Sequence, residues 1–375
     1  MPGCPPSIMT NPVRILHIAP GEPFGGVQRI VLNLAAHQAP DHAVAVLWTG
    51  AADRALAQMP ASGVSAMTAS GSPVSRIIAA RRAVKSFGPD VIHLHMPPPW
   101  AAFALGSSRA AVCYHLHGPP REGGGGPGAQ LATWLDARII ARADMLIAIS
   151  DWIENAWRKD FPQADYRSVF NGIPPGSGKA VIRSVDAANP AIIGFASRLA
   201  PDKGVDEFAT FALALSRKVS HVRFRVAGEG PDRTLLENRL KPLIASGMVE
   251  LLGHVTDMPA FWAQLDLAIF SAPGEPFGLR LIEPVAEGVP VIAYETGAGS
   301  DEIARNCAGI ATVPYEQAEA MAELAAELLD DPGRRARMAQ AGQRDIERSF
   351  SIASMAAGVD AVYSEILASK GGKSH

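Results

Sequence analysis

The 375-residue sequence has little cysteine and little excess charge. Its three cysteines, Cys4, Cys113 and Cys307, are too few and too dispersed for a disulfide framework or a cysteine-based metal site, and they suit a reducing compartment. The net charge of −3 argues against a general nucleic-acid binder, because neutralising phosphates needs clustered positive charge. We therefore expect no nucleic acid among its partners.

Long uncharged apolar runs are also missing. The longest candidate, residues 100–113, contains Arg109 and two serines, so no stretch reaches the ~18 residues that a membrane-spanning helix requires. Residues 1–12 have neither the basic start nor the apolar core of a secretory signal. These absences predict a cytoplasmic protein without a transmembrane span.

Apolar residues are plentiful, at 48% of the chain, and they form short strand patterns that alternate with helical ones. Residues 13–19 and 191–196 are strand patterns, each followed by a loop rich in Gly and Pro and then an amphipathic helix. Further strand patterns cover residues 43–48, 91–95, 111–117, 145–149 and 167–170 in the first half, and 222–227, 249–252, 267–271, 290–293 and 310–313 in the second. This alternation predicts βαβ units and a parallel sheet in each half.

The repeated pattern predicts an α/β chain of two Rossmann-like, doubly wound parallel-sheet domains with a cleft between them. The expected parts are a disordered tail 1–12, an N-terminal domain 13–175, a linker 176–190, a C-terminal domain 191–350, a helix 351–368 and a disordered tail 369–375. Ligands of such sheets bind at the carboxyl ends of the strands. We therefore expect the loops after the strands to hold the site.

The most informative loop covers residues 271–283, Ser-Ala-Pro-Gly-Glu-Pro-Phe-Gly-Leu-Arg-Leu-Ile-Glu. It leads into a helix that should begin near Gly278, where free backbone amides, including that of Leu279, would suit an anion. Glu275 and Glu283 are carboxylates that accept hydrogen bonds from hydroxyls. Spacing alone is equally compatible with a surface helix that carries ordinary glutamates.

The spacing of Glu275 and Glu283 resembles the E-x7-E motif of retaining glycosyltransferases, in the form E-P-F-G-L-x-x-x-E. With residues 288–302 after it, this stretch is similar to glycosyltransferase family 4, also described as group 1 glycosyl transferases, and the resemblance extends from Pro20 to about Phe350. It implies the two-domain GT-B fold. It also implies transfer of a hexosyl group, with retention, from a nucleotide-diphosphate sugar to a hydroxyl, with a lipid-linked saccharide of envelope or exopolysaccharide biosynthesis as the expected acceptor.

Other residues match the same family. Arg198 and Lys203 share the loop 197–204, where the family's Arg and Lys hold the donor diphosphate. His117 matches a histidine that contacts the transferred sugar. The roles that the resemblance implies are catalytic for His117, Arg198, Lys203 and Glu275, and donor-binding for Gly26, Arg198, Lys203, Val255, Glu275, Phe277, Gly278, Leu279 and Glu283.

Paired histidines raise the question of a metal site. His93 and His95 share one face of a strand pattern, and His115 and His117 share one face of another. No acidic residue is interleaved and no third ligand has a defined spacing, which favours structural roles for the first three histidines. We expect no metal and no other cofactor, because the two cations of the diphosphate loop would do what a divalent ion does elsewhere.

Two segments allow more than one interpretation. Arg76, Arg81, Arg82 and Lys85 fall on one helix pattern, where attraction to an anionic membrane competes with the simpler explanation of a solvated face. The glycine-rich run within residues 121–128 suits a mobile lid and a tolerated insertion equally well.

Two other functions are compatible with the sequence. A nucleotide-sugar epimerase can use a similar two-domain scaffold, and it would epimerise the donor without an acceptor. A non-catalytic nucleotide-sugar-binding protein would keep the fold, although the intact acid and cation pairs argue against decay. A dehydrogenase is disfavoured because the chain lacks the G-x-G-x-x-G fingerprint.

Overall fold

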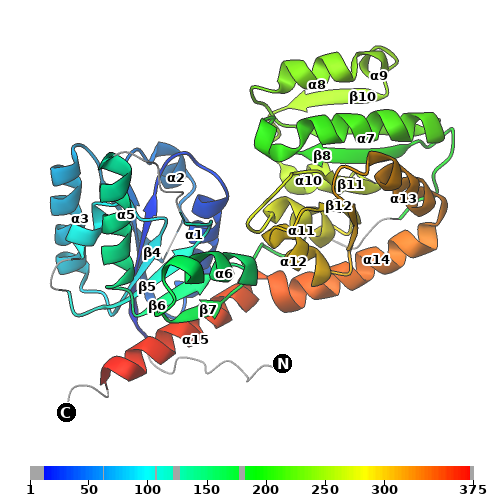
Figure 1. Ribbon diagram of the computed structural model, residues 1–375. Coiled ribbons are helices and arrows are strands. Elements are labelled where there is room, and N and C mark those ends of the chain that lie inside the picture. The colour runs from blue at the N-terminus through cyan, green and yellow to red at the C-terminus, as the bar shows by residue number, and fades with distance from the viewer. Residues whose placement is uncertain (1–11, 62, 106–107, 121–126, 177–181, 372–375) are drawn as a thin grey trace. The chain divides into compact units, whose positions relative to one another are not determined.

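The computed structural model describes residues 12–61, 63–105, 108–120, 127–176 and 182–371 (Figure 1). The chain divides into two compact units, one made of Met1–Pro174 with Ser351–His375 and the other of Pro175–Phe350. The glycine run at 121–126, most of the first tail, the end of the second tail and residues 177–181 of the expected linker lie outside the described residues.

The first unit is built on a seven-stranded sheet with the order β3-β2-β1-β4-β5-β6-β7, in which every pair is parallel. Its strands are β1 (Arg14–Pro20), β2 (Ala43–Thr49), β3 (Val64–Ala69), β4 (Val91–His95), β5 (Ala111–Leu116), β6 (Met145–Ala148) and β7 (Tyr166–Ser168). Its helices are α1 (Gly26–Gln38), α2 (Asp53–Ala57), α3 (Pro73–Phe87), α4 (Ala101–Ala104), α5 (Pro127–Ile140), α6 (Asp151–Asp160) and α15 (Ile352–Gly371).

The second unit is built on a six-stranded parallel sheet with the order β10-β9-β8-β11-β12-β13. Its strands are β8 (Ala191–Ala196), β9 (Val222–Ala227), β10 (Val249–Gly253), β11 (Leu267–Phe270), β12 (Val291–Glu295) and β13 (Ile310–Pro314). Its helices are η1 (Pro201–Lys203), α7 (Val205–Lys218), α8 (Arg233–Arg239), α9 (Lys241–Ala245), α10 (Met258–Trp262), α11 (Leu279–Ala286), α12 (Gly299–Arg305), α13 (Ala318–Asp330), α14 (Pro332–Asp345) and η2 (Ile346–Phe350).

The predicted pair of doubly wound parallel sheets is confirmed. Inner strands such as β4 and β11 are buried along their whole length, as expected for strands that helices cover on both faces. The strand order reverses between β1 and β4 in the first sheet and between β8 and β11 in the second. Ligands of doubly wound sheets bind at such switch points, outside the carboxyl ends of the strands.

Helix α7 shows how the sequence pattern becomes core packing. Its apolar side chains recur at helical spacing and are fully or almost fully buried against the second sheet. Phe208 stacks on Phe195 of β8 with ring centroids 4.5 Å apart. Burying one such aromatic side chain contributes about 1.5–3 kcal/mol to stability. This packing fixes the helix that follows the loop of Arg198 and Lys203.

Two elements differ from the sequence-based expectation. Strand β3, Val64–Ala69, was not predicted, because it is an edge strand in which only Ala69 is buried and its apolar pattern is weak. Helix α15 runs through Gly371, three residues past the expected end at 368. It returns to the first unit, where it packs beside α1 and against β5 and β6.

None of the helices in the described part of the chain combines the length and the apolar character needed to span a membrane.

Candidate functional site

The loop after β8 passes very close to the end of β11. Helix α7 begins at Val205, as predicted, and Gly204 before it has a φ of +69°. A Cβ atom at Gly204 would lie 1.9 Å from the carbonyl oxygen of Ser271. Glycine is therefore required at this position both for its backbone conformation and for the close approach.

Ser271 ties the two loops together. Its buried hydroxyl donates a hydrogen bond to the carbonyl oxygen of Gly204 at 2.7 Å. The end of the loop after β8 is thus joined to the start of the loop after β11, at the point where the strand order reverses. This joint positions Lys203, which directly precedes Gly204, and the residues that follow Ser271.

Lys203 and Glu275, which the sequence analysis assigned to one site, are in contact. Lys203 Nζ donates to Glu275 Oε1 at 2.6 Å and lies 3.1 Å from Oδ2 of Asp202. Burial would lower the pKa of the Lys203 ammonium, but the hydrogen bonds and charges of Glu275 and Asp202 outweigh it and raise that pKa. A fixed cation therefore stands beside a carboxylate at the carboxyl ends of β8 and β11.

Arg198 lies on the same loop and is more exposed. Its guanidinium donates to both carboxylate oxygens of Asp202, at 2.9 and 3.2 Å. Burial opposes the ionised form of Asp202, but Lys203 and Arg198 lower its pKa. Asp202 was not predicted from the sequence, although its spacing of four residues from Arg198 was a usable signal. An anion that binds these two cations competes with Asp202.

Helix α11 begins at Leu279, as predicted. Gly278, the residue before it, has a φ of +84°. Glu283 lies in its second turn and accepts a hydrogen bond from Arg280 at 2.6 Å, a partner that the sequence analysis missed. The contacts of the described residues link Glu283 to Arg280 rather than to Lys203 or Glu275. The two glutamates thus share one loop and helix but have different cationic partners.

Phe277 and Val255 have different surroundings from the other predicted residues. The Phe277 side chain is buried, and its ring packs edge-on against that of Phe350 at 6.3 Å, so only its backbone is available to a ligand. Val255 follows β10, the edge strand that lies two strands away from β8. It lines a pocket of about 270 Å³ with Leu252 and Phe261.

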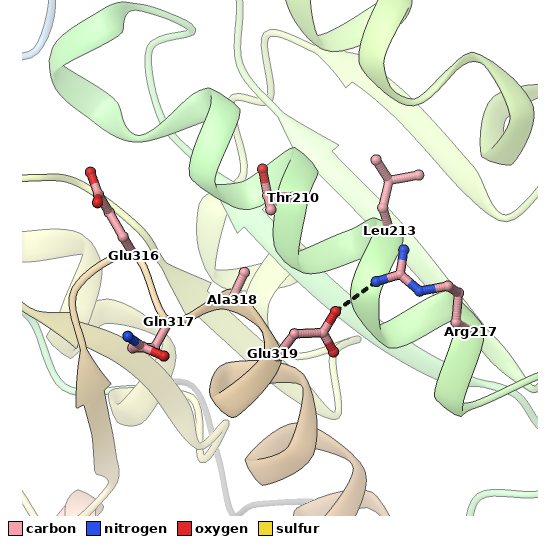
Figure 2. Close-up of a pocket in the computed structure, with 7 residues that line it drawn as sticks. All are labelled: Thr210, Leu213, Arg217, Glu316, Gln317, Ala318 and Glu319. Carbon is pink, nitrogen blue, oxygen red and sulfur yellow. Dashed lines mark hydrogen bonds and ion pairs between the residues drawn. The ribbon is translucent and has the colours of Figure 1, made fainter.

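A second pocket of the same unit contains none of the predicted site residues. It has a volume of about 340 Å³ and lies between α7 and the start of α13 (Figure 2). Arg217 of α7 and Glu319 of α13 form an ion pair of 2.7 Å across it. Because α7 reaches this pocket with its later turns, the pocket does not belong to the loops after β8 and β11.

The glycine loop of the first unit is held by a residue that the sequence analysis missed. Helix α1 begins at Gly26, and the side chain of Gln28 accepts a hydrogen bond from the Gly25 amide at 2.9 Å. The same side chain donates to the carbonyl oxygen of Pro20 at 2.9 Å. Gln28 therefore closes the loop between β1 and the first turn of α1.

Five histidines gather on one face of the first sheet. His17 of β1 is paired in register with His93 of β4, and His95 of β4 with His115 of β5. These four are fully buried and His117 is half-buried. Burial lowers the pKa of His17 to about 4 and that of His117 to about 3, and it lowers the others well below their usual value. All five rings are therefore neutral at pH 7.

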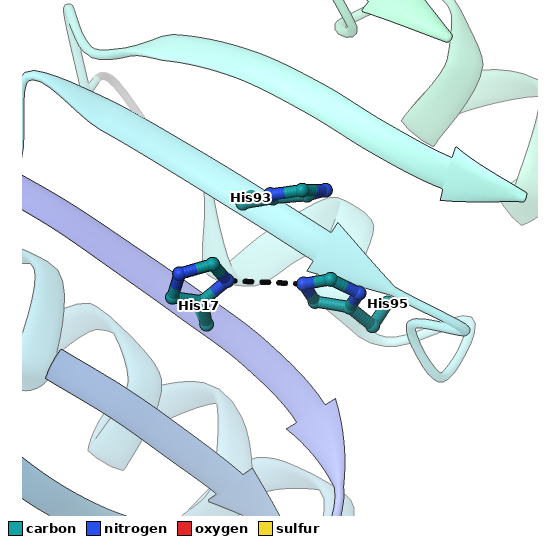
Figure 3. A group of neighbouring side chains, drawn as sticks. All are labelled: His17, His93 and His95. Atoms are coloured by element: carbon teal, nitrogen blue, oxygen red, sulfur yellow. Dashed lines mark hydrogen bonds between the residues drawn. The ribbon is translucent and has the colours of Figure 1, made fainter. Parts of the chain in front are cut away.

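The five histidines lie closer together than expected from the sequence. His17, His93 and His95, which Figure 3 shows, each offer a ring nitrogen within 4.8 Å of the other two. The same is true of His95, His115 and His117. Imidazole nitrogens are common metal ligands. The expectation of no metal stays a prediction. His17 was not identified from the sequence, because a single histidine in a strand gives no signal until the register is known.

Comparison with known proteins identifies the family. The model of glycosyltransferase family 4 matches residues 24–176, and that of glycosyl transferases group 1 matches residues 181–345. The chain is 28% identical to an exopolysaccharide phosphotransferase of Streptomyces coelicolor, over 83% of the chain but 36% of that protein, so it spans about a third of that relative's length.

A further relative and a solved structure are also similar to the chain. A GDP-mannose-dependent alpha-mannosyltransferase of Mycobacterium tuberculosis is 27% identical, over 74% of the chain and 72% of that protein. The Anabaena protein HepE, solved in complex with UDP-glucose, superposes with a TM-score of 0.72 at 18% identity, over 95% of the chain and all of that structure, which shows the same fold. The second unit matches the group 1 glycosyl transferase model, and the first matches that of family 4. The chain is therefore a glycosyltransferase, a member of family 4 with the GT-B fold.

Proposed function

We propose that the chain transfers a hexosyl group from a nucleotide-diphosphate sugar to a hydroxyl acceptor, with retention of configuration. The contact between Lys203 and Glu275 carries this proposal. It places a cation that suits a phosphate beside a carboxylate that suits sugar hydroxyls, at the switch point of a doubly wound sheet. The UDP-glucose bound by HepE and the GDP-mannose dependence of the mycobacterial relative support a donor of this class.

The leaving diphosphate gains negative charge as the bond to the sugar breaks. Lys203 and Arg198 are the cations on the loop after β8. The backbone amides of Gly278 and Leu279 lie at the N-terminus of helix α11, where they suit a negatively charged group. Fixed donors aimed at developing charge lower the barrier. Since these groups supply the stabilisation, we propose that transfer needs no divalent metal.

The remaining residues of the site would bind the sugar nucleotide. Glu275 would accept hydrogen bonds from hydroxyls of the transferred sugar, and Glu283 from hydroxyls of the ribose. Val255 would contact the base through its backbone, and Gly26 would face the phosphate from the start of α1. His117 would contact the transferred sugar.

For the acceptor, we propose a lipid-linked saccharide presented at the cytoplasmic face of an anionic membrane. Helix α3 contains four cations and no acidic residue, and it packs against α4, which packs against α5. Five large apolar side chains on these helices are exposed: Val74, Ile78, Phe103, Leu131 and Trp134. Apolar side chains among cations suit the interface of an anionic bilayer.

Purified protein, a panel of nucleotide sugars and a lipid-linked saccharide acceptor test the proposal. We expect one donor to yield an elongated acceptor whose new linkage keeps the anomeric configuration of the donor, with EDTA present throughout. An epimerised donor formed without an acceptor would support the epimerase instead. Loss of transfer in EDTA and its recovery with Mn²⁺ would contradict the metal-free account.

A further inference from the structure

A continuous row of hydrogen bonds crosses the buried histidine face of the first unit. Asp360 Oδ1 on α15 accepts from Gln38 Nε2 on α1 at 2.8 Å, and Gln38 Oε1 lies 3.0 Å from His17 Nε2. His17 Nδ1 lies 3.0 Å from His95 Nε2, the contact that Figure 3 shows. His95 Nδ1 lies 3.0 Å from His117 Nε2. Five side chains are thus linked from α15 to the residue after β5.

The donor and acceptor roles in one hydrogen bond of the row determine those in the next. Burial keeps the pKa of each of the three rings far below 7, so that each ring is neutral and has one N–H donor and one lone pair. A neutral ring that donates through one nitrogen must accept through the other. The polarity of the row, meaning which partner donates in each hydrogen bond, is therefore the same from one end to the other.

Asp360 sets the polarity. An ionised carboxylate only accepts, so the Gln38 amide must present its NH2 group to Asp360 and its oxygen to His17. That oxygen also only accepts, so His17 carries its proton on Nε2 and accepts through Nδ1. The same step repeated along the row puts the proton of His95 and that of His117 on Nε2.

We propose that Asp360, Gln38, His17 and His95 are positioning residues that hold His117 in a single tautomer, with its proton on Nε2 and a lone pair on Nδ1. The inference deepens the proposed function, on which its substrate consequence rests. In this tautomer Nδ1 accepts a hydrogen bond from a sugar hydroxyl and cannot donate one. His117 would therefore select a donor sugar that has a hydroxyl at the contacted position.

A bound metal ion is the competing use of these rings. The nitrogens of His17, His95 and His117 that face each other are already joined by hydrogen bonds. Neither histidine group includes a carboxylate that would offset a divalent charge in this buried layer. The geometry therefore favours the hydrogen-bonded row.

The tautomer can be measured directly by NMR of the full-length chain with ¹⁵N-labelled histidine. Nitrogen shifts and their coupling to the ring protons show which nitrogen of a neutral imidazole is protonated, and His117→Gln assigns the signals. We expect the Nε2–H tautomer of His117 in roughly tenfold excess or more, since reversal would leave buried groups unpaired. A protonated Nδ1, a charged ring or signals that shift on removal of a bound metal would overturn the proposal.

Two variants interrupt the row at the end formed by Asp360 and Gln38. Gln38→Leu removes the amide, and Asp360→Asn replaces the carboxylate by a group that both donates and accepts, so either should produce a mixture of His117 tautomers. Asp360→Asn is nearly isosteric, so it still tests the role of Asp360 in the His117 tautomer if Gln38→Leu fails to fold. An unchanged tautomer in a folded Asp360→Asn variant would overturn the role of Asp360.

Tyr363→Phe is the matched control. Tyr363 lies on α15, as Asp360 does, and its hydroxyl is 2.6 Å from Nδ1 of His93, which is outside the row. The hydroxyl also interacts with the Gln38 side chain, but its removal leaves the hydrogen bond from Gln38 to Asp360 in place. This variant removes a buried hydrogen bond next to the same histidines. We expect it to lower stability without changing the tautomer of His117, which separates positioning from a general loss of structure.

Donor analogues test the substrate consequence. A donor in which the contacted hydroxyl is replaced by hydrogen or by fluorine cannot donate to Nδ1, so we expect both analogues to lose about tenfold or more in kcat/KM. Asp360→Asn should lower kcat/KM severalfold for the natural donor and leave that of the deoxy analogue nearly unchanged. Equal losses for both donors would mean that His117 does not contact that hydroxyl through Nδ1. The NMR experiment needs no turnover, so an absence of transfer together with the expected tautomer would contradict the proposed function alone.

Discussion

At the scale of single residues, the close approach at Gly204 determines where Lys203 and Glu275 stand. A Cβ there would collide with the carbonyl oxygen of Ser271, and the backbone conformation at φ +69° is itself unfavourable for other residues. We expect Gly204→Ala to lower the free energy of unfolding by about 2–4 kcal/mol and transfer by tenfold or more, because the two loops would separate. Chemical denaturation and initial-rate assays would measure both effects.

Gly88 offers a matched control for this prediction. It also has a positive φ, +61°, but no atom lies within 4 Å of the position its Cβ would take. Gly88→Ala should therefore show only the backbone cost of about 1 kcal/mol and normal transfer. Equal effects of the two substitutions would show that the contact with Ser271 does not position the site.

Residues in strong sequence patterns were the ones that could be predicted. Lys203 and Glu275 follow buried strands and precede helices, so their place at the carboxyl edge was readable. Asp202 and Arg280 were not identified, because their importance lies in ion pairs that only the folded loops create. His17 was missed for a similar reason, since the sheet register brings it beside His93.

At the scale of elements, α3 is the part that the membrane proposal depends on. Arg82 and Lys85 are exposed on this helix, whereas Arg81 is bonded to the carbonyl oxygen of Phe103. We expect the double variant Arg82→Ala, Lys85→Ala to bind vesicles of anionic lipid roughly 30-fold more weakly, at about 1 kcal/mol per cation near the surface. Co-sedimentation at two salt concentrations would measure this.

The control for α3 is Arg217→Ala in the second unit, which removes an exposed cation elsewhere. It should leave vesicle binding unchanged. Retained binding in the α3 double variant would instead favour a solvated face, the simpler of the two sequence-based interpretations.

Every strand of the two sheets was predicted from the sequence except the edge strand β3. Strands β4, β8 and β9 begin and end where the apolar runs do. The edge strand β3 has too few buried residues to show such a run. The length of α15 depends on tertiary contacts, because its buried face packs on α1 and on the first sheet. Local sequence does not contain that information.

At the scale of the whole molecule, the return of the chain to the first unit through α15 could not be predicted from its strand and helix patterns. The expected C-terminal helix was present in the sequence, but nothing in its pattern showed which sheet it covers. The structure places Tyr363 of this helix against His93 of the first sheet and Asp360 against Gln38 of α1. The first unit is therefore complete only with residues from both ends of the chain.

The buried histidines predict how stability depends on pH. Four fully buried rings have a folded-state pKa far below the unfolded value of about 6.5, and that of His17 is about 4. Below pH ~6.5 the unfolded chain therefore binds protons that the folded chain does not. For His17 alone, the free energy of unfolding should fall by roughly 2 kcal/mol between pH 7 and pH 5, and the other three rings act in the same direction.

Urea denaturation at pH 7, 6 and 5 checks this sign. Burial raises the pKa of Asp360, which acts in the opposite direction, but it is one group against four. Stability that stays constant or rises over this pH range would show that the rings are already protonated in the folded protein.

The central claim is that the loops after β8 and β11 bind the diphosphate of a sugar nucleotide. Calorimetry with UDP-glucose and GDP-mannose in EDTA, on the parent chain, Lys203→Ala and the control Arg217→Ala, tests it most directly. The account predicts binding of at least one of these donors, a 10- to 100-fold loss of its affinity in Lys203→Ala and a roughly 10²–10³-fold loss of turnover, with Arg217→Ala unchanged. Equal affinity and turnover in all three proteins would contradict it.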